Sequence, residues 1–360
     1  MKILVGMSGG VDSSVTACIL KEAGHEVIGA TMSVWDKGRA YNILSHKDAC
    51  FSPHEERDIE EAEAVCRKLG LEYHVIDCTK QYQKLVLSNF KQEYLSGRTP
   101  NPCVWCNSMI KFEALPKSAA EKGIVFDKFA TGHYARLLYN EDNKRWQLRR
   151  AVDERKDQTY FLYRLKQEQL EKIMLPLGEY SKNDVREIAR RHGLKVSDKP
   201  DSQDFYSGNI NDILQTPPQP GNFVDTHGKI LGHHQGIWNF TVGQRKGLGI
   251  SAERPLYVIS LNKKTNEVVL GYDEECYKQS LTAKNLSWLS VPCFEKTEDI
   301  YVKLRSSQHP VAAEVNVFSE DGAEVVFREK QKAVAFGQSV VFYNKDGLVL
   351  GGGIIDSSAD

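Results

Sequence analysis

Blocks of apolar residues alternate with amphipathic stretches along the first two hundred residues. Short apolar runs predict strands, and apolar positions that recur every three or four residues predict the helices between them. The predicted strands are residues 3–5, 27–34, 73–77 and 126–130, and the predicted helices are 12–23, 55–69, 82–94 and 182–192. This alternation favours an α/β fold with a doubly wound parallel sheet, which binds its ligands at the carboxyl ends of the strands.

The pattern changes near residue 206, where prolines and glycines become frequent. Short strands at close spacing follow, which is typical of a small barrel or sandwich. These strands are predicted at residues 256–261, 267–270, 301–304, 312–318, 323–327 and 339–343. We therefore predict three domains: an α/β domain over residues 1–205, a central domain over 206–280 and a C-terminal β-barrel domain over 281–360.

Composition and charge narrow the function only slightly. The chain has 360 residues, of which 41% are hydrophobic and 26% charged, as in an ordinary globular protein. Its formal net charge is −1, so binding to nucleic acid would need local basic groups such as Arg149-Arg150 or Arg245-Lys246, which could equally form solvated faces. The chain start does not resemble a signal peptide, and no apolar run is long enough to span a bilayer. We therefore expect a cytoplasmic enzyme with no membrane partner.

A glycine-rich loop follows the first predicted strand and directly precedes the first predicted helix. It consists of Gly6, Met7, Ser8, Gly9, Gly10, Val11, Asp12 and Ser13. Glycines let backbone N–H groups approach an anion, and a helix N-terminus adds unpaired donors. The loop lacks the Lys-Ser/Thr ending of a Walker A loop and the spacing of a dinucleotide fingerprint. The sequence predicts a phosphate site here, although a helix cap after a tight turn could use the same residues.

A second candidate site contains the cysteine pair Cys103 and Cys106. The pair lies in the polar segment 98–107, whose prolines are expected to disfavour a helix. A C-x-x-C pair can bind a metal, exchange thiols or hold an activated nucleophile. A structural zinc site would need a second such pair, which this chain does not contain. The alternative is two structural thiols.

The two motifs together resemble the tRNA-specific 2-thiouridylase family (MnmA/TrmU), and the resemblance covers nearly the whole chain. The run Ser-Gly-Gly-x-Asp-Ser is similar to the signature of PP-loop ATP pyrophosphatases, which cleave ATP between its α and β phosphates. Further matching segments are residues 97–102, 106–107, 110–112, 130–136, 156–162, 241–249 and 337–342. The resemblance implies a PP-loop ATP pyrophosphatase domain, then a small central domain and a C-terminal β-barrel.

The resemblance also implies a chemistry, namely ATP-dependent 2-thiolation of a tRNA uridine, with the wobble position as the expected target. ATP, aided by Mg²⁺, would adenylate the C2 oxygen, and a cysteine-borne sulfur would then displace AMP. The sulfur would come from a cysteine desulfurase, a sulfur relay protein or sulfide. The implied site residues are Cys106, Cys103 and Asp12 for catalysis; Gly6 to Ser13, Met32 and Gly132 for ATP; Asn101, Pro102 and Cys103 for the target base; and His133, Lys156, Asp157, Gln158, Arg305 and Gln338 for tRNA.

The cysteines depart from the family's pattern. Tyr206 lies where the second catalytic cysteine is expected, a few residues after Asp201-Ser202, and a tyrosine cannot carry a persulfide. Cys103 stands where the family usually has an aspartate. Two substitutes are open: Cys103 could act as the partner of Cys106, or Cys50, Cys103 and Cys106 could hold a 4Fe–4S cluster with one open iron site. Cys50 could also be a simple packed thiol.

Two rival functions use the same motifs. A PP-loop ligase that acts on a small molecule would need neither the C-terminal β domain nor the cysteine pair. A degraded RNA-binding or sulfur-carrier paralogue would explain Tyr206, although the intact glycine loop argues against it. Arg305 is followed by Ser306 where the family usually has a tyrosine, so the RNA target could differ from the usual one.

Overall fold

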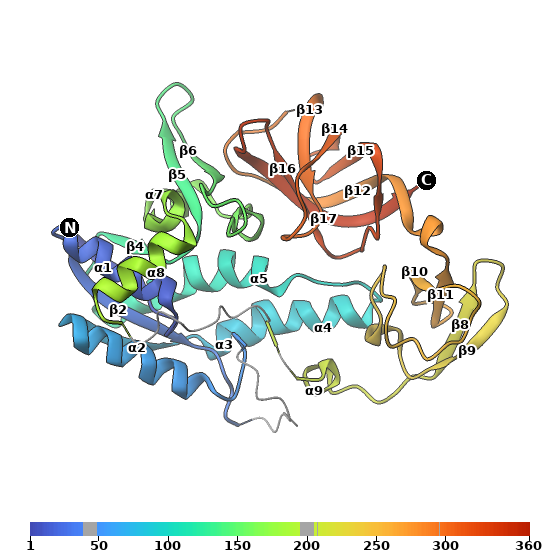
Figure 1. The fold of residues 1–360 in the computed structure, drawn as a ribbon, viewed down its shortest axis with the longest axis horizontal. Coiled ribbons are helices and arrows are strands. Elements are labelled where there is room, and N and C mark those ends of the chain that lie inside the picture. The colour runs from blue at the N-terminus through green and yellow to red at the C-terminus, as the bar shows by residue number, and fades with distance from the viewer. Residues whose placement is uncertain (39–48, 195–204, 207, 295) are drawn as a thin grey trace.

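The computed structural model describes residues 1–38, 49–194, 205, 206, 208–294 and 296–360. Asp201-Ser202, which precedes the expected position of the second cysteine, lies outside the described residues. Figure 1 shows three parts: a sheet flanked by helices at the left, a barrel at the upper right and a small β-rich part at the lower right.

A five-stranded parallel sheet of order β3-β2-β1-β4-β7 forms the N-terminal domain. Its strands are β1 (Lys2–Gly6), β2 (Glu26–Ser33), β3 (Glu72–Asp77), β4 (Lys128–Ala130) and β7 (Ile173–Met174). Ile3 and Val5 pack with α1 (Val11–Glu22), α2 (Glu55–Leu69) and α8 (Lys182–Arg191) in one apolar cluster. Leu4 packs on the opposite face in a second cluster, because successive side chains of a strand alternate. Helices on both faces confirm the predicted doubly wound sheet.

Two helical runs cover the second face, and one of them extends well beyond the sheet (Figure 1). The first run is α3 (Thr79–Tyr82), η1 (Gln83–Leu87) and α4 (Ser88–Leu95), and the second is α5 (Pro102–Trp105), η2 (Cys106–Ala114) and α6 (Leu115–Glu121). Both η1 and η2 are π-helical. The expectation that prolines keep the cysteine segment out of a helix is wrong from Pro102 onward. Pro102 begins α5, where a missing N–H costs nothing.

The rest of the chain is mainly β-structure. A four-stranded sheet of order β10-β11-β8-β9 forms the central part, and a closed barrel of order β12-β15-β14-β13-β16-β17 confirms the predicted C-terminal β-barrel. The strands are β8 (Gly221–Asp225), β9 (Ile230–His234), β10 (Tyr257–Asn262), β11 (Glu267–Gly271), β12 (Tyr277–Trp288), β13 (Lys296–Lys303), β14 (Val311–Ser319), β15 (Gly322–Lys332), β16 (Ser339–Tyr343) and β17 (Val349–Ala359). The limits of the three domains stay a prediction, and β12 runs across the limit placed at residue 280.

A hairpin connects the N-terminal domain to the barrel. Its strands are β5 (Ala135–Asn140) and β6 (Arg145–Arg150), and Arg149 forms a β-bridge with Leu348. The remaining short elements are α7 (Gln167–Glu171), α9 (Ile210–Leu214), η3 (Thr159–Phe161), η4 (Pro176–Glu179), η6 (Ile237–Asn239) and η7 (Asp273–Cys276). Within the described ranges, no helix combines the length and the apolar character needed to cross a membrane.

Candidate active site

The glycine loop turns from the end of β1 directly into α1. Gly10 is the N-cap of α1, and the Ser14 hydroxyl donates to its carbonyl over 2.8 Å. The Ser8 N–H donates to the Ser13 hydroxyl oxygen over 3.1 Å, which folds the loop over the helix end. Gly9 has φ +71°, and a Cβ there would lie 2.7 Å from the Asp58 carbonyl oxygen, so only glycine fits. The first N–H groups of α1 have no partner within the helix and form a ready anion site.

A lysine that the sequence analysis did not identify lies beside this loop. The Lys182 ammonium, from the first turn of α8, contacts both oxygens of Asp12 at 2.7 and 2.9 Å, and its side chain is 8% exposed. The Tyr134 hydroxyl donates to the same carboxylate over 2.8 Å. Asp12 therefore holds a buried cation at the helix N-terminus. Only a long-range contact between α1 and α8 creates this pair, so no local sequence motif marks it.

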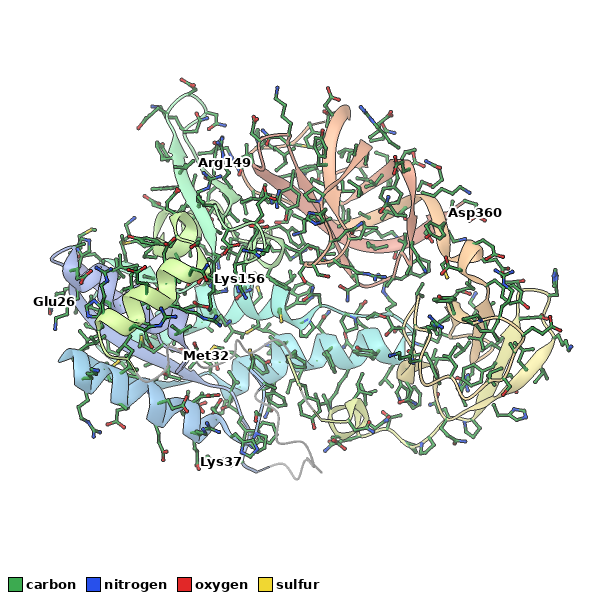
Figure 2. The ribbon with its side chains drawn as sticks, viewed as in Figure 1. Glu26, Met32, Lys37, Arg149, Lys156 and Asp360 are labelled. Carbon is green, nitrogen blue, oxygen red and sulfur yellow. The ribbon has the colours of Figure 1, made fainter. Side chains whose placement is uncertain are left out.

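The carboxyl end of β2 and the turn that follows β4 complete the same edge of the sheet. The Thr31 hydroxyl donates to the Met7 carbonyl over 2.8 Å, which fixes the loop against β2. A Cβ at Gly132 would lie 2.7 Å from the Asp12 carbonyl carbon and 2.8 Å from the Ser13 nitrogen, so this turn packs directly on the start of α1. Met32 lies on β2, toward the middle of the N-terminal domain (Figure 2). The structure thus gathers the expected ATP residues at the carboxyl ends of β1, β2 and β4.

Three cysteines and a lysine form the second part of the site, which we call the thiol cluster: Cys50, Cys103, Cys106 and Lys111. Burial raises the pKa of Cys103 to about 12, and the thiols of Cys50 and Cys106 add to the shift. Burial also raises the pKa of Cys106 to about 11, although the Lys111 ammonium opposes this change. Burial acts to lower the pKa of Lys111, but the attraction of its ammonium to the three cysteine sulfurs in their thiolate form outweighs burial and raises the pKa. Cys103 and Cys106 are therefore neutral thiols at pH 7 in this state.

The π-helix η2 explains why Lys111 faces Cys106. Lys111 lies five residues after Cys106, and a π-helix bonds each residue to the one five positions on. In an α-helix the two side chains would point about 140° apart. The wider turn therefore brings the ammonium back toward the thiol, and π-helical turns are often found at functional sites.

Cys50 lies beside the segment that carries Tyr206. The Phe51 N–H donates to the Phe205 carbonyl over 3.0 Å, and the two phenyl rings stack with centroids 6.0 Å apart. The Tyr206 ring lies 6.2 Å from that of Phe51. Position 206 has a tyrosine instead of the expected cysteine, but Cys50 places a thiol on the neighbouring segment. Cys50 is exposed.

The thiol cluster is not arranged to hold a single metal ion. Among the residues that the structure describes, no three His, Cys, Asp or Glu side chains are close enough together to hold a metal ion. Three thiols are the donor set of a 4Fe–4S cluster with one open iron site, and Cys50 and Cys106 lie near enough to Cys103 to raise its pKa, so the cluster hypothesis stays a prediction.

Two of the expected tRNA contacts are buried, and a third, Gln158, is half-buried. The Asp157 side chain is fully buried between Arg150 and Lys303, at 3.6 and 3.7 Å. Gln158 accepts the Tyr134 N–H over 2.9 Å, which braces the turn beside Asp12. Burial, followed by the charge of Lys111, lowers the pKa of His133 to about 3, so this imidazole stays neutral at pH 7.

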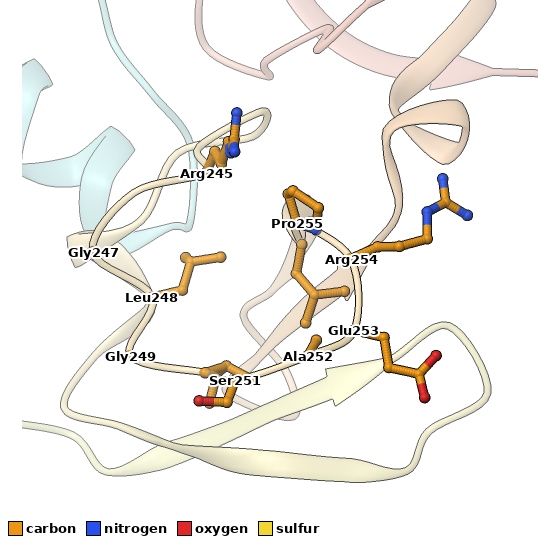
Figure 3. A pocket seen from close by; sticks show the side chains of 11 residues that line it. Arg245, Gly247, Leu248, Gly249, Ser251, Ala252, Glu253, Arg254 and Pro255 are labelled. Atoms are coloured by element: carbon orange, nitrogen blue, oxygen red, sulfur yellow. The ribbon is translucent and has the colours of Figure 1, made fainter.

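The other expected RNA contacts and one pocket lie nearer the surface. Lys156 is partly exposed and Arg305 exposed, whereas the Gln338 amide donates to the backbone of the loop before α5. Figure 3 shows a pocket of about 690 Å³ lined by residues from Arg245 to Leu256. Its lining lies in the central part and includes no residue of the glycine loop or the thiol cluster.

Comparisons with known proteins agree with this architecture. The chain matches family models described as "tRNA methyl transferase HUP domain" over residues 1–206, "tRNA methyl transferase PRC-barrel domain" over 210–272 and "Aminomethyltransferase beta-barrel domain" over 278–355. A tRNA-specific 2-thiouridylase MnmA from Endomicrobium trichonymphae is 48% identical over 357 residues, which cover 99% of both chains.

A second relative and one solved structure complete the comparison. An MnmA from Acetivibrio thermocellus is 44% identical over 361 residues, or 98% of this chain and 99% of that protein. The solved structure of a 4-thiouridine synthetase with RNA and ATP gives a TM-score of 0.35 at 17% identity, over 56% of this chain and 44% of that one. That last likeness is too slight to support any inference.

Proposed function

This chain belongs to the tRNA-specific 2-thiouridylase family, and we propose that it uses ATP to replace the C2 oxygen of a tRNA uridine by sulfur. One observation supports this proposal above all: the glycine loop and the thiol cluster share the turn Gly132-His133. Gly132 packs on Asp12. The charge of Lys111 acts to lower the pKa of His133 and also that of Cys106. A nucleotide on the loop and a base beside Cys106 would therefore meet across a single turn.

In the first step, the uridine C2 oxygen attacks the α-phosphorus of ATP. The bond to the bridging oxygen breaks, pyrophosphate leaves, and the uridine N3 proton passes to solvent. The N–H groups of the loop and the N-terminus of α1 face the negative charge that develops on pyrophosphate. Lys182 supplies a fixed positive charge at the same place, held by Asp12.

In the second step, a persulfide on Cys106 delivers sulfur. Its terminal sulfur attacks C2, and AMP leaves with the former C2 oxygen. The base is then joined to Cys106 through a disulfide. A second thiol attacks the Cys106 sulfur, which releases the 2-thiouridine and leaves a protein disulfide that an external dithiol reduces. A cysteine desulfurase or a sulfur relay protein supplies this sulfur, already at the oxidation level of a persulfide. Sulfide is more reduced and would instead attack the adenylated C2 directly and displace AMP, with no persulfide on Cys106.

Cys103 is our choice for the second thiol. It precedes Cys106 by three residues on the same helical run, whereas Cys50 is exposed and lies on a different segment. The proposed steps do not use a 4Fe–4S cluster, because a persulfide on Cys106 and a second thiol are enough to complete the transfer. Iron in the purified protein, lost together with activity in Cys50→Ser, would instead favour the cluster hypothesis.

Mg²⁺ is expected to arrive with ATP rather than on Asp12. Both Asp12 oxygens already contact Lys182, and Tyr134 donates to one of them, so most acceptor positions of the carboxylate are occupied. Lys182 takes over part of the charge neutralisation that a metal ion often provides in phosphoryl transfer.

The two rival functions fit the observations less well. A ligase for small molecules would not need the barrel, whose Gln338 contacts the loop that leads to Cys103. A degraded paralogue would not need to keep Lys182 buried against Asp12, since an unused buried ion pair contributes little to stability.

The test is a reconstituted reaction. The purified protein is incubated with unmodified tRNA, ATP, a persulfide donor and a thiol reductant. The tRNA nucleosides are then analysed by mass spectrometry. The proposal predicts 2-thiouridine, dependent on ATP and absent with Cys106→Ala, while Cys293→Ala, an exposed cysteine of the barrel region, leaves it unchanged. If the protein exchanges pyrophosphate into ATP without RNA, and forms no thionucleoside when tRNA is added, the result would favour the small-molecule ligase.

A further inference from the structure

The segment between α4 and α5 contacts the C-terminal barrel. It comprises residues 97–101, the first part of the matching segment 97–102, and it leads directly into the helix that carries Cys103 and Cys106. The function proposed above gives no role to Arg98 or Thr99. Their contacts are to the barrel rather than to the nucleotide edge of the sheet.

Arg98 spans the junction with its guanidinium. Its Nε donates to Glu93 on α4 over 2.7 Å, its Nη1 to Asp356 on β17 over 3.2 Å, and its Nη2 to the Ile355 carbonyl over 2.9 Å. Lys284 on β12 holds the other Asp356 oxygen at 2.6 Å. The Arg98 side chain is only 22% exposed, so this network is shielded from much of the solvent.

Gln338 holds the next two residues. Its side-chain amide donates to the Thr99 carbonyl over 3.0 Å and to the Pro100 carbonyl over 3.2 Å. The Thr99 N–H donates in turn to the Phe336 carbonyl over 2.7 Å. Gln338 is itself fixed, because its carbonyl accepts the Ile355 N–H over 2.8 Å inside the barrel.

Two glycines let the segment 97–101 approach the barrel and the central part this closely. A Cβ at Gly337, where φ is +90°, would lie 3.0 Å from the Thr99 nitrogen. A Cβ at Gly97, where φ is +73°, would lie 3.0 Å from the Ile237 side chain of the central part. The segment is thus held between the central part and the barrel.

We propose that Gln338 and Arg98 are positioning residues that set where α5 begins and therefore where Cys103 and Cys106 lie. This inference rests on the proposed function for its catalytic consequence, but not for its structural one. Asn101, the N-cap of α5, directly follows the Gln338-bonded carbonyls. Its side chain interacts with the Tyr160 hydroxyl, which donates to the Ser339 carbonyl over 2.9 Å. The barrel thus holds the start of the helix on consecutive residues.

The resemblance assigns Gln338 to tRNA binding, and an experiment without RNA separates the two roles. The alkylation rates of Cys103 and Cys106 by N-ethylmaleimide are followed by peptide mass spectrometry in wild type, Gln338→Ala and Asp356→Asn. Loss of the hydrogen bonds frees the helix start, so we expect alkylation of Cys106 to accelerate roughly tenfold. We also expect kcat for thiolation to fall by about tenfold or more, with KM for tRNA unchanged.

Gln331→Ala is the matched control, because the hydrogen bonds of Gln331 stay inside the barrel. It should alkylate at the wild-type rate, and thermal melting of all variants checks that they are folded. Alkylation of Gln338→Ala at the wild-type rate would overturn the proposal, whether or not tRNA binding weakens. Since alkylation needs neither ATP nor RNA, its outcome stands even if no thiolation is found.

Discussion

The glycine loop and the thiol cluster lie on either side of one turn, yet they are assembled in different ways. The loop consists of consecutive residues, and hydrogen bonds within a few positions of each other shape it. The thiol cluster takes Cys50 from the segment before α2 and Cys103, Cys106 and Lys111 from the α5–η2 run. A site that binds phosphate can be encoded locally, because backbone N–H groups do the work. A site that moves sulfur needs side chains from several segments.

The largest expected effect is the loss of thiolation when Cys106 is removed, with ATP activation by the glycine loop retained. Cys106→Ala should abolish thiolation, a loss of at least about 10³-fold as for other covalent nucleophiles. The glycine loop is untouched, so RNA-dependent exchange of pyrophosphate into ATP should persist within a few-fold of wild type. Radiolabelled pyrophosphate measures the exchange, and nucleoside mass spectrometry measures the thiolation. Equal loss of both activities would show that the two regions cannot be separated.

The next effect concerns the loop alone. Lys182→Met keeps the length of the side chain but leaves the Asp12 carboxylate unopposed beside the phosphate site. We expect pyrophosphate exchange to fall by about 10²-fold, in line with removal of one electrostatic contact to a developing charge.

Lys144→Met is the control for Lys182→Met, since Lys144 pairs with Glu141 on an exposed turn. It should keep the full rate of exchange. If Lys182→Met were as active as this control, the buried ion pair would have no part in ATP activation.

A smaller effect tests which thiol completes the cluster. Cys103→Ser should slow turnover by roughly tenfold to a hundredfold and let the tRNA–Cys106 disulfide accumulate, because the thiol proposed to resolve it is gone. Cys50→Ser should cost only a few-fold. Denaturing gels without reductant show the adduct, which dithiothreitol should remove. An adduct in Cys50→Ser instead would assign the resolving role to Cys50.

The smallest effect concerns the shared turn. Burial, reinforced by Lys111, lowers the pKa of His133 to about 3, below its usual value near 6.5. The unfolded chain therefore binds an extra proton between these pH values, and stability falls as the pH drops through that window, by at most about 1.4 kcal/mol per pH unit. The drop in Tm between pH 7.5 and 5.5 should be smaller in His133→Gln than in wild type.

His227→Gln is the control for the His133 experiment, because His227 is exposed. Its Tm should fall between the two pH values by as much as that of wild type. An identical fall in His133→Gln would mean that the His133 imidazole does not stay neutral in the folded protein.

The sequence predicted the part of the site that is local. The loop from Gly6 to Ser13 was recognised because its glycines, its strand and its helix are contiguous. Lys182 was missed because its link to Asp12 depends on the packing of α8 against α1. Lys111 lies in the matching segment 110–112, but its role depends on a π-helical turn that the residue pattern does not show.

In the fold, too, features set by local sequence were predicted and features set by tertiary packing were not. The doubly wound sheet and the barrel follow from apolar periodicity, and both are confirmed. Strand β17 was not predicted, because Gly351, Gly352 and Gly353 interrupt its apolar pattern. A Cβ at Gly352 would lie 2.5 Å from the Val340 carbonyl oxygen, so tertiary packing selects glycine there. Asp157 was expected to contact tRNA, but its burial depends on Lys303, far along the chain.

The fate of one oxygen atom tests the central claim most directly. A tRNA carrying ¹⁸O at the C2 position of its target uridine is thiolated in a single turnover, and the AMP is analysed by mass spectrometry. If the uridine oxygen attacks the α-phosphorus and leaves with it, AMP carries one ¹⁸O for each 2-thiouridine formed. Unlabelled AMP beside 2-thiouridine would contradict the account, because the oxygen would then have left by a route that ATP does not activate.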